Sequence, residues 1–113
     1  MRYGTFGIAG LIFLAACSTS TSSSATCTGM GASAIVSASD ANTFSPANPT
    51  ITHGQTVCWE NTGSVGHTVT DDGGAFNASL ASGATFTHVY ALPGVFPYHC
   101  TIHAGMVGAI TVN

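Results

Sequence analysis

Residues 98–106 read Tyr98-His99-Cys100-Thr101-Ile102-His103-Ala104-Gly105-Met106. The stretch holds a thiolate at Cys100, an imidazole at His103 and a thioether at Met106, with two residues between each pair. A loop this short, placed at the end of a strand, can turn all three side chains toward one point. The stretch therefore predicts a metal site at a strand end, and that expectation decides how the rest of the chain is interpreted.

A second imidazole, His67, follows a turn that contains Gly63 and Gly66. Two histidines and a cysteine in a trigonal set, with a weak axial methionine, are typical of blue copper sites that transfer electrons. Cu(I) favours soft ligands in low coordination and Cu(II) accepts nitrogen donors, so a rigid compromise geometry lets an electron move with little rearrangement. We therefore expect one copper ion bound by His67, Cys100 and His103, with Met106 as the axial ligand.

The remaining sequence is typical of an all-β domain. Short runs rich in β-branched and aromatic residues alternate with Gly, Pro, Asn and Asp, and no segment shows helical periodicity with caps. Spacing of this kind predicts a β-sandwich or barrel. The expected strands cover residues 34–38, 50–52, 56–60, 67–70, 86–90, 96–100 and 108–112.

From Phe44 to the C-terminus the chain resembles the cupredoxins, the plastocyanin- and amicyanin-like blue copper proteins. The matching segments, in order, are Phe44-Ser-Pro46, Val57-Cys-Trp59-Glu-Asn61, His67-Thr-Val69, Pro93-Gly94, Tyr98-His-Cys100 and Gly108-Ala-Ile110. The spacing Cys-x-x-His-x-x-Met resembles the short ligand loop of the amicyanin-like members. The resemblance implies a Greek-key sandwich of the cupredoxin type over residues 34–113. It also implies a monomer, not an enzyme, that shuttles single electrons between protein redox partners.

Two positions depart from the pattern of many relatives. Ile102 stands where they carry proline, and Thr68 stands where they carry an asparagine that ties the first strand to the cysteine loop. We expect the Thr68 hydroxyl to reach Thr101 instead, and the Thr68 backbone N–H to reach the Cys100 sulfur. The second contact would tune the reduction potential.

The family also implies an exposed C-terminal ligand histidine inside an apolar patch, where electrons leave. In this chain the residue is His103. The residues that we expect to frame it are Val65, Ala104, Gly105, Val107 and the Pro93-Gly94 turn.

The N-terminus predicts export. Residues 1–16 have one basic residue, a short apolar run and small residues at the end, which together are typical of a signal peptide. Leu14-Ala-Ala-Cys17 resembles the lipobox of bacterial-type lipoproteins, so we expect a lipid on Cys17 and membrane attachment on the extracytoplasmic, periplasmic side. Residues 17–33 form a Ser/Thr-rich linker. Ordinary signal cleavage that discards Cys17 is the alternative.

Charge argues against nucleic acid as a partner. The only basic residue is Arg2, inside the expected signal, while the acidic residues are Asp40, Glu60, Asp71 and Asp72. Phosphate binding needs clustered positive charge, which the rest of the chain does not offer.

Four cysteines allow three pairings. If Cys17 is lipidated and Cys100 binds metal, only Cys27 and Cys58 remain, and an oxidising compartment favours their disulfide. Two free thiols are one alternative. An immunoglobulin-like sandwich that pairs Cys58 with Cys100 is another, but it leaves the histidines unexplained.

The other histidines are not expected to bind the ion. His99 points away from Cys100 by strand alternation, and His53 lies in a turn. His88 shares the inward parity of Phe86 and Tyr90, and we interpret it as a buried or barrel-end histidine rather than a second metal site.

Three rival functions remain open. An extracytoplasmic copper carrier or storage protein would deliver the ion itself. A copper domain of an oxidase or nitrite reductase would need a partner subunit, because this chain has one site. A structural zinc ion accepts Cys and His, but it would leave Met106 without a role.

Overall fold

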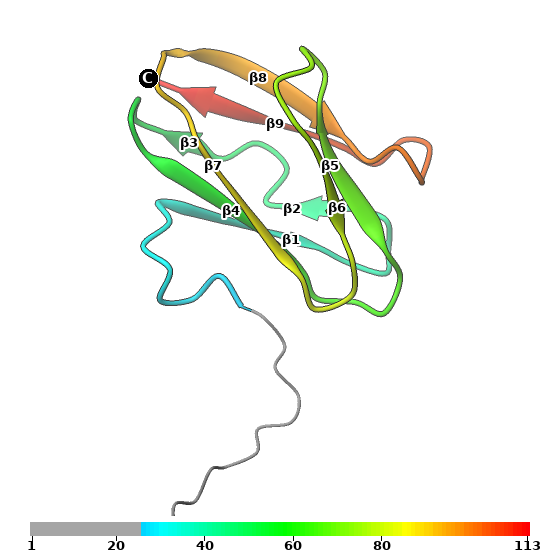
Figure 1. Ribbon diagram of the computed structural model, residues 1–113. Coiled ribbons are helices and arrows are strands. Elements are labelled where there is room, and N and C mark those ends of the chain that lie inside the picture. Colours follow the sequence, from blue (N-terminus) through cyan, green and yellow to red (C-terminus); the bar gives the residue numbers. More distant parts are fainter. Residues whose placement is uncertain (1–25) are drawn as a thin grey trace, which may run out of the picture.

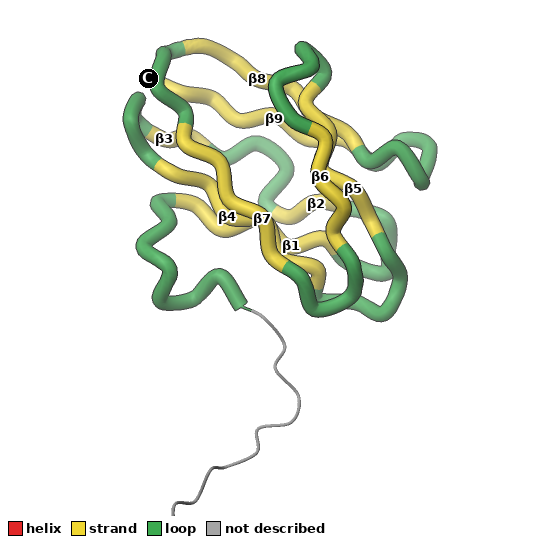
Figure 2. The backbone as a smooth tube through the Cα atoms, in the orientation of Figure 1, coloured by secondary structure: helices red, strands yellow, loops and turns green. Residues whose placement is uncertain are grey.

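The computed structural model describes residues 26–113. They form two β-sheets packed face to face, joined by loops and turns (Figure 1, Figure 2). The four-stranded sheet has the order β2 (Phe44–Ser45), β1 (Ala34–Ala38), β4 (Thr56–Asn61) and β7 (Thr85–Val89). The five-stranded sheet has the order β3 (Thr50–Ile51), β9 (Val107–Val112), β8 (Gly94–His99), β5 (His67–Asp71) and β6 (Asn77–Leu80). Within residues 26–113 no helix is long and apolar enough to cross a membrane.

The sheets hold together because alternate residues of their strands face one shared core. Trp59, on β4, has no exposed surface, and its ring packs edge-on against Tyr98 of β8 with centroids 5.4 Å apart. Phe86 and Phe76 pack on the same indole at 5.6 and 5.9 Å. These contacts join strands of both sheets, so the all-β prediction is confirmed. Two short strands, β2 and β6, were not predicted.

The outer face of β4 is also covered. Cys58 forms a disulfide with Cys27, which carries the segment before β1 across that face. The Glu60 carboxylate accepts the Cys27 backbone N–H at 2.8 Å and the Ser37 hydroxyl at 3.3 Å. The expected disulfide is therefore confirmed. The immunoglobulin-like pairing is excluded, because Cys100 is a free cysteine.

Strand pairing brings the proposed ligands to one end of the sandwich. β5 and β8 run antiparallel, with Thr70 opposite His99, so the loop after His99 lies near the first residues of β5. Figure 1 shows this loop, residues 100–106, projecting beyond the strands between β8 and β9. Gly94 begins β8 at the other end of the sandwich. Five residue steps of an extended strand separate it from His99, a distance of about 17 Å. The expectation that the Pro93-Gly94 turn frames His103 is therefore wrong.

Three predictions concern residues outside those that the structure describes. They are the signal peptide over residues 1–16, the lipid on Cys17 and the first part of the expected linker, residues 17–25.

Candidate metal centre

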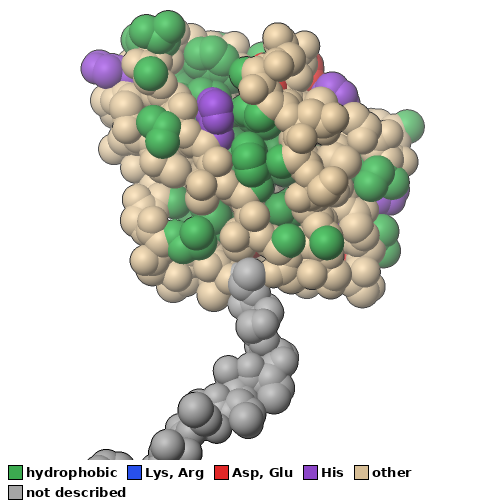
Figure 3. All heavy atoms as spheres, viewed as in Figure 1, with side chains coloured by type: hydrophobic (Ala, Val, Ile, Leu, Met, Phe, Trp, Pro, Cys, Tyr) green, Lys and Arg blue, Asp and Glu red, His purple; other side chains and the backbone are tan. Residues whose placement is uncertain are grey.

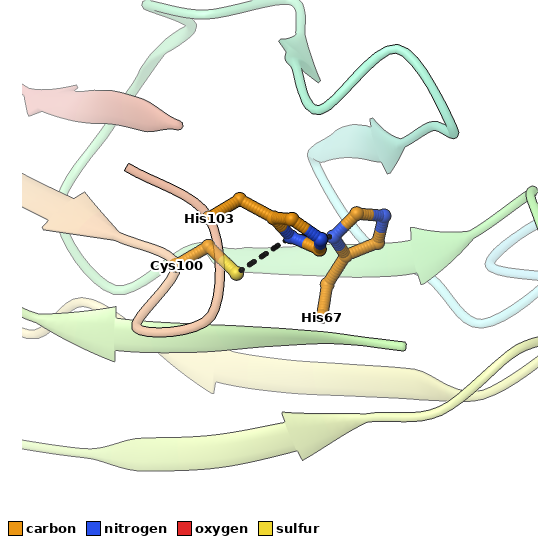
Figure 4. A group of neighbouring side chains, drawn as sticks. All are labelled: His67, Cys100 and His103. Atoms are coloured by element: carbon orange, nitrogen blue, oxygen red, sulfur yellow. Dashed lines mark hydrogen bonds between the residues drawn. The ribbon is translucent and has the colours of Figure 1, made fainter. Parts of the chain in front are cut away.

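Three donor side chains converge where β5 begins and β8 ends. His67, Cys100 and His103 each offer one ligand atom, and these atoms all lie within 4.8 Å of one another. The two Nδ1 atoms are 3.2 Å apart, and the Cys100 sulfur is 3.6 Å from Nδ1 of His103. Figure 4 shows the two imidazole rings close together, inclined by 60°, with the Cys100 sulfur beside the His103 ring. The structure therefore brings together three of the four residues that the sequence pattern selected.

The fourth predicted ligand, Met106, is held close to the other loop residues. Its backbone carbonyl accepts the Cys100 N–H at 2.9 Å, and its own N–H bonds to the His103 carbonyl at 3.3 Å. These two bonds close the loop into a compact turn. The Met106 side chain is buried, with 1 % of its surface exposed. The structure therefore places Met106 in the interior beside the loop that carries Cys100 and His103.

Thr68 ties the first ligand strand to this loop. Its backbone N–H donates to the Cys100 sulfur at 3.4 Å. Its side-chain oxygen accepts the Thr101 backbone N–H at 2.8 Å and lies 3.2 Å from the Thr101 hydroxyl. Both contacts expected from the sequence are confirmed. Thr68 thus fills the linking role that asparagine has in many relatives.

The same contacts favour the thiolate form of Cys100. Burial raises the pKa of a thiol, but hydrogen bonds from the backbone of Thr68 and Ile102 and from His103 outweigh it, and the pKa of Cys100 falls to about 6. A thiolate, not a thiol, is the form that binds a metal ion. The loop therefore presents its sulfur in the binding form at neutral pH.

The turn before His67 is fixed by two residues that the sequence analysis did not select. The Asp40 carboxylate accepts the backbone N–H groups of Ser64 and Val65 at 2.9 and 3.1 Å. The Asn61 side-chain amide donates to the carbonyls of Val65 and Leu80 at 2.7 and 2.9 Å. The hydrogen bond from the Val65 N–H, followed by that from the Ser64 hydroxyl, lowers the pKa of Asp40.

Sequence signals for these two residues were weak. Asn61 stood inside the family-like segment 57–61, but nothing in the sequence indicated what its amide would bond. Asp40 appeared only as one of four acidic residues, and its partners lie 24 and 25 positions away. A glycine is required opposite it, because a Cβ on Gly63 would overlap the Asp40 side chain.

Exposure differs among the four residues. His67 and Cys100 are buried, with 2 % and 4 % of their surfaces exposed, whereas His103 is only partly buried. Exposed apolar side chains lie on the segments that carry or adjoin the ligands, namely Val65, Ile102 and Val107. Val65 and Val107, which were expected to frame His103, are thus exposed apolar side chains. Ile102 is a third exposed apolar side chain that was not expected there.

The donor set fits a copper ion. Imidazole nitrogens bind first-row ions such as zinc at about 2.0–2.1 Å, so two nitrogen donors on one ion lie at most about 4 Å apart. The 3.2 Å between the two Nδ1 atoms meets that limit. One thiolate with two imidazoles suits the nitrogen- and sulfur-binding metals, and this set together with a methionine is typical of copper sites that transfer electrons.

A family model describing copper binding proteins of the plastocyanin/azurin family matches residues 32–113. This chain belongs to that copper-binding family. The cupredoxin is 33 % identical to a purple cupredoxin of known structure from Nitrosopumilus maritimus, with a TM-score of 0.66 over 71 % of this chain and 99 % of that one. An oxidised amicyanin variant has a TM-score of 0.65 at 20 % identity, over 70 % of this chain and 80 % of that one, which supports the sandwich fold.

A curated relative of this cupredoxin is the chloroplast plastocyanin of Oryza sativa subsp. indica. The two are 31 % identical in an alignment over 84 residues, and the match covers 62 % of this chain and 54 % of the relative. The chain thus spans about half the length of that plastocyanin.

The cupredoxin places its other histidines away from the cluster. His99 contacts the Asp72 carboxylate, and exposed His53 lies 3.0 Å from the Asn113 carbonyl through Nδ1. His88 packs against Phe76 and Tyr90, with ring centroids 4.6 and 4.7 Å away. The inward parity predicted for His88 is confirmed, and the side chain is half-buried.

Proposed function

We propose that this cupredoxin shuttles single electrons between protein redox partners, through one copper ion held by His67, Cys100, His103 and Met106. The observation that carries the proposal is the convergence of two imidazole nitrogens and a thiolate within 4.8 Å. When bound, copper supplies the one-electron couple between Cu(II) and Cu(I). The protein's part is to hold the donors in one geometry for both oxidation states.

The hydrogen bonds around the cluster support a protein that holds the donor atoms in one geometry. Thr68 holds the Cys100 sulfur and the Thr101 backbone together, and the backbone bonds of Met106 close the loop on both ligand residues. Such outer contacts orient ligands and tune the metal. A site with this many fixed contacts rearranges little when charge changes.

His103 is the proposed electron port. It is the one member of the three-residue cluster that is not buried. The exposed apolar side chains Val65, Ile102 and Val107, the proposed apolar patch, lie on segments that carry or adjoin the proposed ligands. An apolar surface lets a partner approach closely without desolvating charges. The described residues contain no Lys or Arg, so contact with a partner would rest on this patch and on acidic groups elsewhere.

Burial favours electron transfer over delivery of the ion. A carrier that hands copper to another protein needs ligands that a recipient can reach. Here Cys100, His67 and Met106 are at most 4 % exposed. A chelator competition separates the two roles, because an electron carrier retains copper for hours at chelator excess while exchanging electrons quickly. Rapid copper loss with sluggish electron exchange would support the carrier or storage role instead.

The proposed location is outside the cytoplasm, with a lipid on Cys17 as the membrane anchor. A lipoprotein-type modification adds more than one acyl chain, which gives lasting attachment where a single chain would not. The wild type should fractionate with membranes, and Cys17→Ser should be released or remain unprocessed. A wild type found wholly in the soluble fraction would contradict the anchor.

Spectroscopy of the copper-loaded protein tests the proposal. The wild type with Cu(II) should show an intense visible band from thiolate-to-copper charge transfer, with a matching EPR signal. Cys100→Ser should abolish the band, whereas the double variant Cys27→Ala/Cys58→Ala should keep it, because that disulfide lies on the outer face of the other sheet. The 33 %-identical relative is described as purple, so the charge-transfer band, rather than a blue hue, is the criterion. A loaded wild type without this band would refute the proposal.

A further inference from the structure

A cavity of about 250 Å³ opens at the part of the sandwich away from the ligand loop. It lies where the end of β5, the loop to β6, the end of β7 and the middle of β8 approach one another. Its lining residues are Asp71, Ala75, Phe76, His88, Val89, Tyr90, Ala91, Leu92 and Phe96. Figure 3 shows hydrophobic side chains in a hollow between the two layers, beside a histidine. None of these residues belongs to the metal centre.

Aromatic rings form one continuous wall of this cavity. Phe76 and His88 have centroids 4.6 Å apart, His88 and Tyr90 4.7 Å, and Tyr90 and Phe96 5.1 Å. Successive rings are tilted by 44° to 79°. The wall therefore presents ring faces in several directions. Ring faces carry negative charge density and attract cations.

The only charged side chain of the lining is a carboxylate. Asp71 is 8 % exposed, and its Oδ2 accepts the Ala75 backbone N–H at 3.0 Å. No Lys or Arg occurs in residues 26–113, so none of the described side chains carries a permanent positive charge to neutralise it. A buried carboxylate that lacks a cationic partner is costly and favours a cation from outside.

His88 adds a neutral hydrogen-bond acceptor. Burial lowers the pKa of His88, and the Asp71 carboxylate offsets part of that effect by raising it. Burial raises the pKa of Tyr90, and the Asp71 carboxylate raises it further. The negative field of Asp71 therefore reaches across the lining. Within the described residues the His88 ring makes no hydrogen bond, which leaves its nitrogens available to a ligand.

We propose that this cavity binds a small organic cation, an ammonium group carried on an apolar or aromatic body. The ammonium N–H groups donate to the Asp71 carboxylate and to His88, while the apolar body packs against Phe76 and Phe96. An anion of the same shape is repelled by Asp71, and a neutral molecule lacks the charge attraction to Asp71 and to the ring faces. A metal ion is the poorer occupant, because the described residues offer one cluster of three metal-binding side chains and it lies elsewhere.

NMR titration of the full chain with three probes of one shape tests the proposal. Benzylammonium, benzyl alcohol and benzoate are added separately at pH 7.5 and low salt, and backbone amide shifts are followed. Benzylammonium should bind roughly tenfold more tightly than benzyl alcohol, a ratio typical of cation–π recognition, and benzoate should bind weakest. The shifts should centre on residues 71–76 and 88–96. Equal affinities for the three probes, or no binding, would overturn the proposal.

Variants separate charge from shape. Asp71→Asn keeps an oxygen for the Ala75 N–H but removes the charge, so the preference for benzylammonium over benzyl alcohol should fall to the part that the ring faces supply. Asp72→Asn changes the adjacent exposed carboxylate and should leave the preference intact. Ala91→Trp fills the cavity from an exposed position, so it should abolish binding of all probes even if Asp71→Asn fails to fold. Binding that survives in Ala91→Trp would place the ligand elsewhere and overturn the assignment. None of these readouts uses copper, so their outcome is independent of the proposed electron transfer.

Discussion

The side-chain oxygen of Thr68 accepts the backbone N–H of Thr101 at 2.8 Å, and this bond ties the strand that begins at His67 to the loop that carries Cys100 and His103. Thr68 also donates its own N–H to the Cys100 sulfur. One residue thus links two proposed ligands, His67 and Cys100, that are 33 positions apart in the chain. Because the first contact uses the side chain and the second uses the backbone, substitution can separate them.

Replacing Thr68 with valine should loosen the link without removing the N–H to the sulfur. Thr68→Val loses the acceptor for Thr101, so the loaded protein should unfold with about 1 kcal/mol less stability, the net value of one hydrogen bond. The reduction potential should change little. Thr101→Val is the matched control, because it keeps the Thr101 N–H and should cost less. Denaturant unfolding and voltammetry of the three proteins provide the comparison, and equal stability of all three would contradict the role of the hydroxyl.

The metal cluster was predictable because its signal is local and chemical. Cys100, His103 and Met106 fall within seven residues, and a soft donor set admits few metals. Strands such as residues 34–38 were predictable from β-branched and apolar residues. Strand β6 was not predictable, because Asn77-Ala-Ser-Leu80 contains asparagine and alanine, which are found less often in strands. It becomes a strand by pairing with β5 from His67 to Thr70, a contact between segments that sequence reading treats separately.

Long-range contacts also limited what the sequence could predict at the site. The positioning role of Asp40 depends on backbone groups 24 residues and more away, and no spacing rule identifies such partners. The expectation for Pro93-Gly94 failed for a related reason. An extended strand, β8, carries those residues to the end of the sandwich opposite the loop of Cys100 and His103.

Met106 should set the reduction potential. In Met106→Gln the copper should remain bound, and the potential should fall because an oxygen donor stabilises Cu(II) more than a thioether does. Met30→Gln is the matched control, since Met30 is 51 % exposed and lies on the segment before β1. Voltammetry of both loaded variants is the measurement. An unchanged or higher potential in Met106→Gln would remove Met106 from the ligand set.

The disulfide should contribute strongly to stability. Cys27 and Cys58 are 31 residues apart, and a crosslink over that separation stabilises by about 3–4 kcal/mol in the chain-entropy model. Cys27→Ala/Cys58→Ala should lose that amount in denaturant unfolding, and the reduced wild type should lose a similar amount. The charge-transfer band should persist in the folded variant. Peptide mapping that finds both cysteines as free thiols in the native protein would contradict the pairing.

His88 should make the protein less stable in mild acid. Burial lowers its folded-state pKa below the value of about 6.5 expected in the unfolded chain, with Asp71 opposing part of the shift. Between those two values the unfolded chain binds more protons than the folded protein, so the free energy of unfolding rises with pH there. The stability that His88 contributes is therefore complete above about pH 6.5 and is lost as the pH falls below it.

His88→Phe isolates this effect, because it keeps a ring between Phe76 and Tyr90 but cannot be protonated. Unfolding of metal-free wild type and variant should be compared from pH 7.5 to pH 5. The other histidines contribute to both proteins, so the difference between the two slopes reports on His88 alone, and the wild type should lose stability more steeply. His53→Phe, on the exposed turn before β4, controls for added aromatic surface. If the free energy of unfolding changed with pH equally in the wild type and in His88→Phe, burial would not lower the pKa of His88 and the prediction would be wrong.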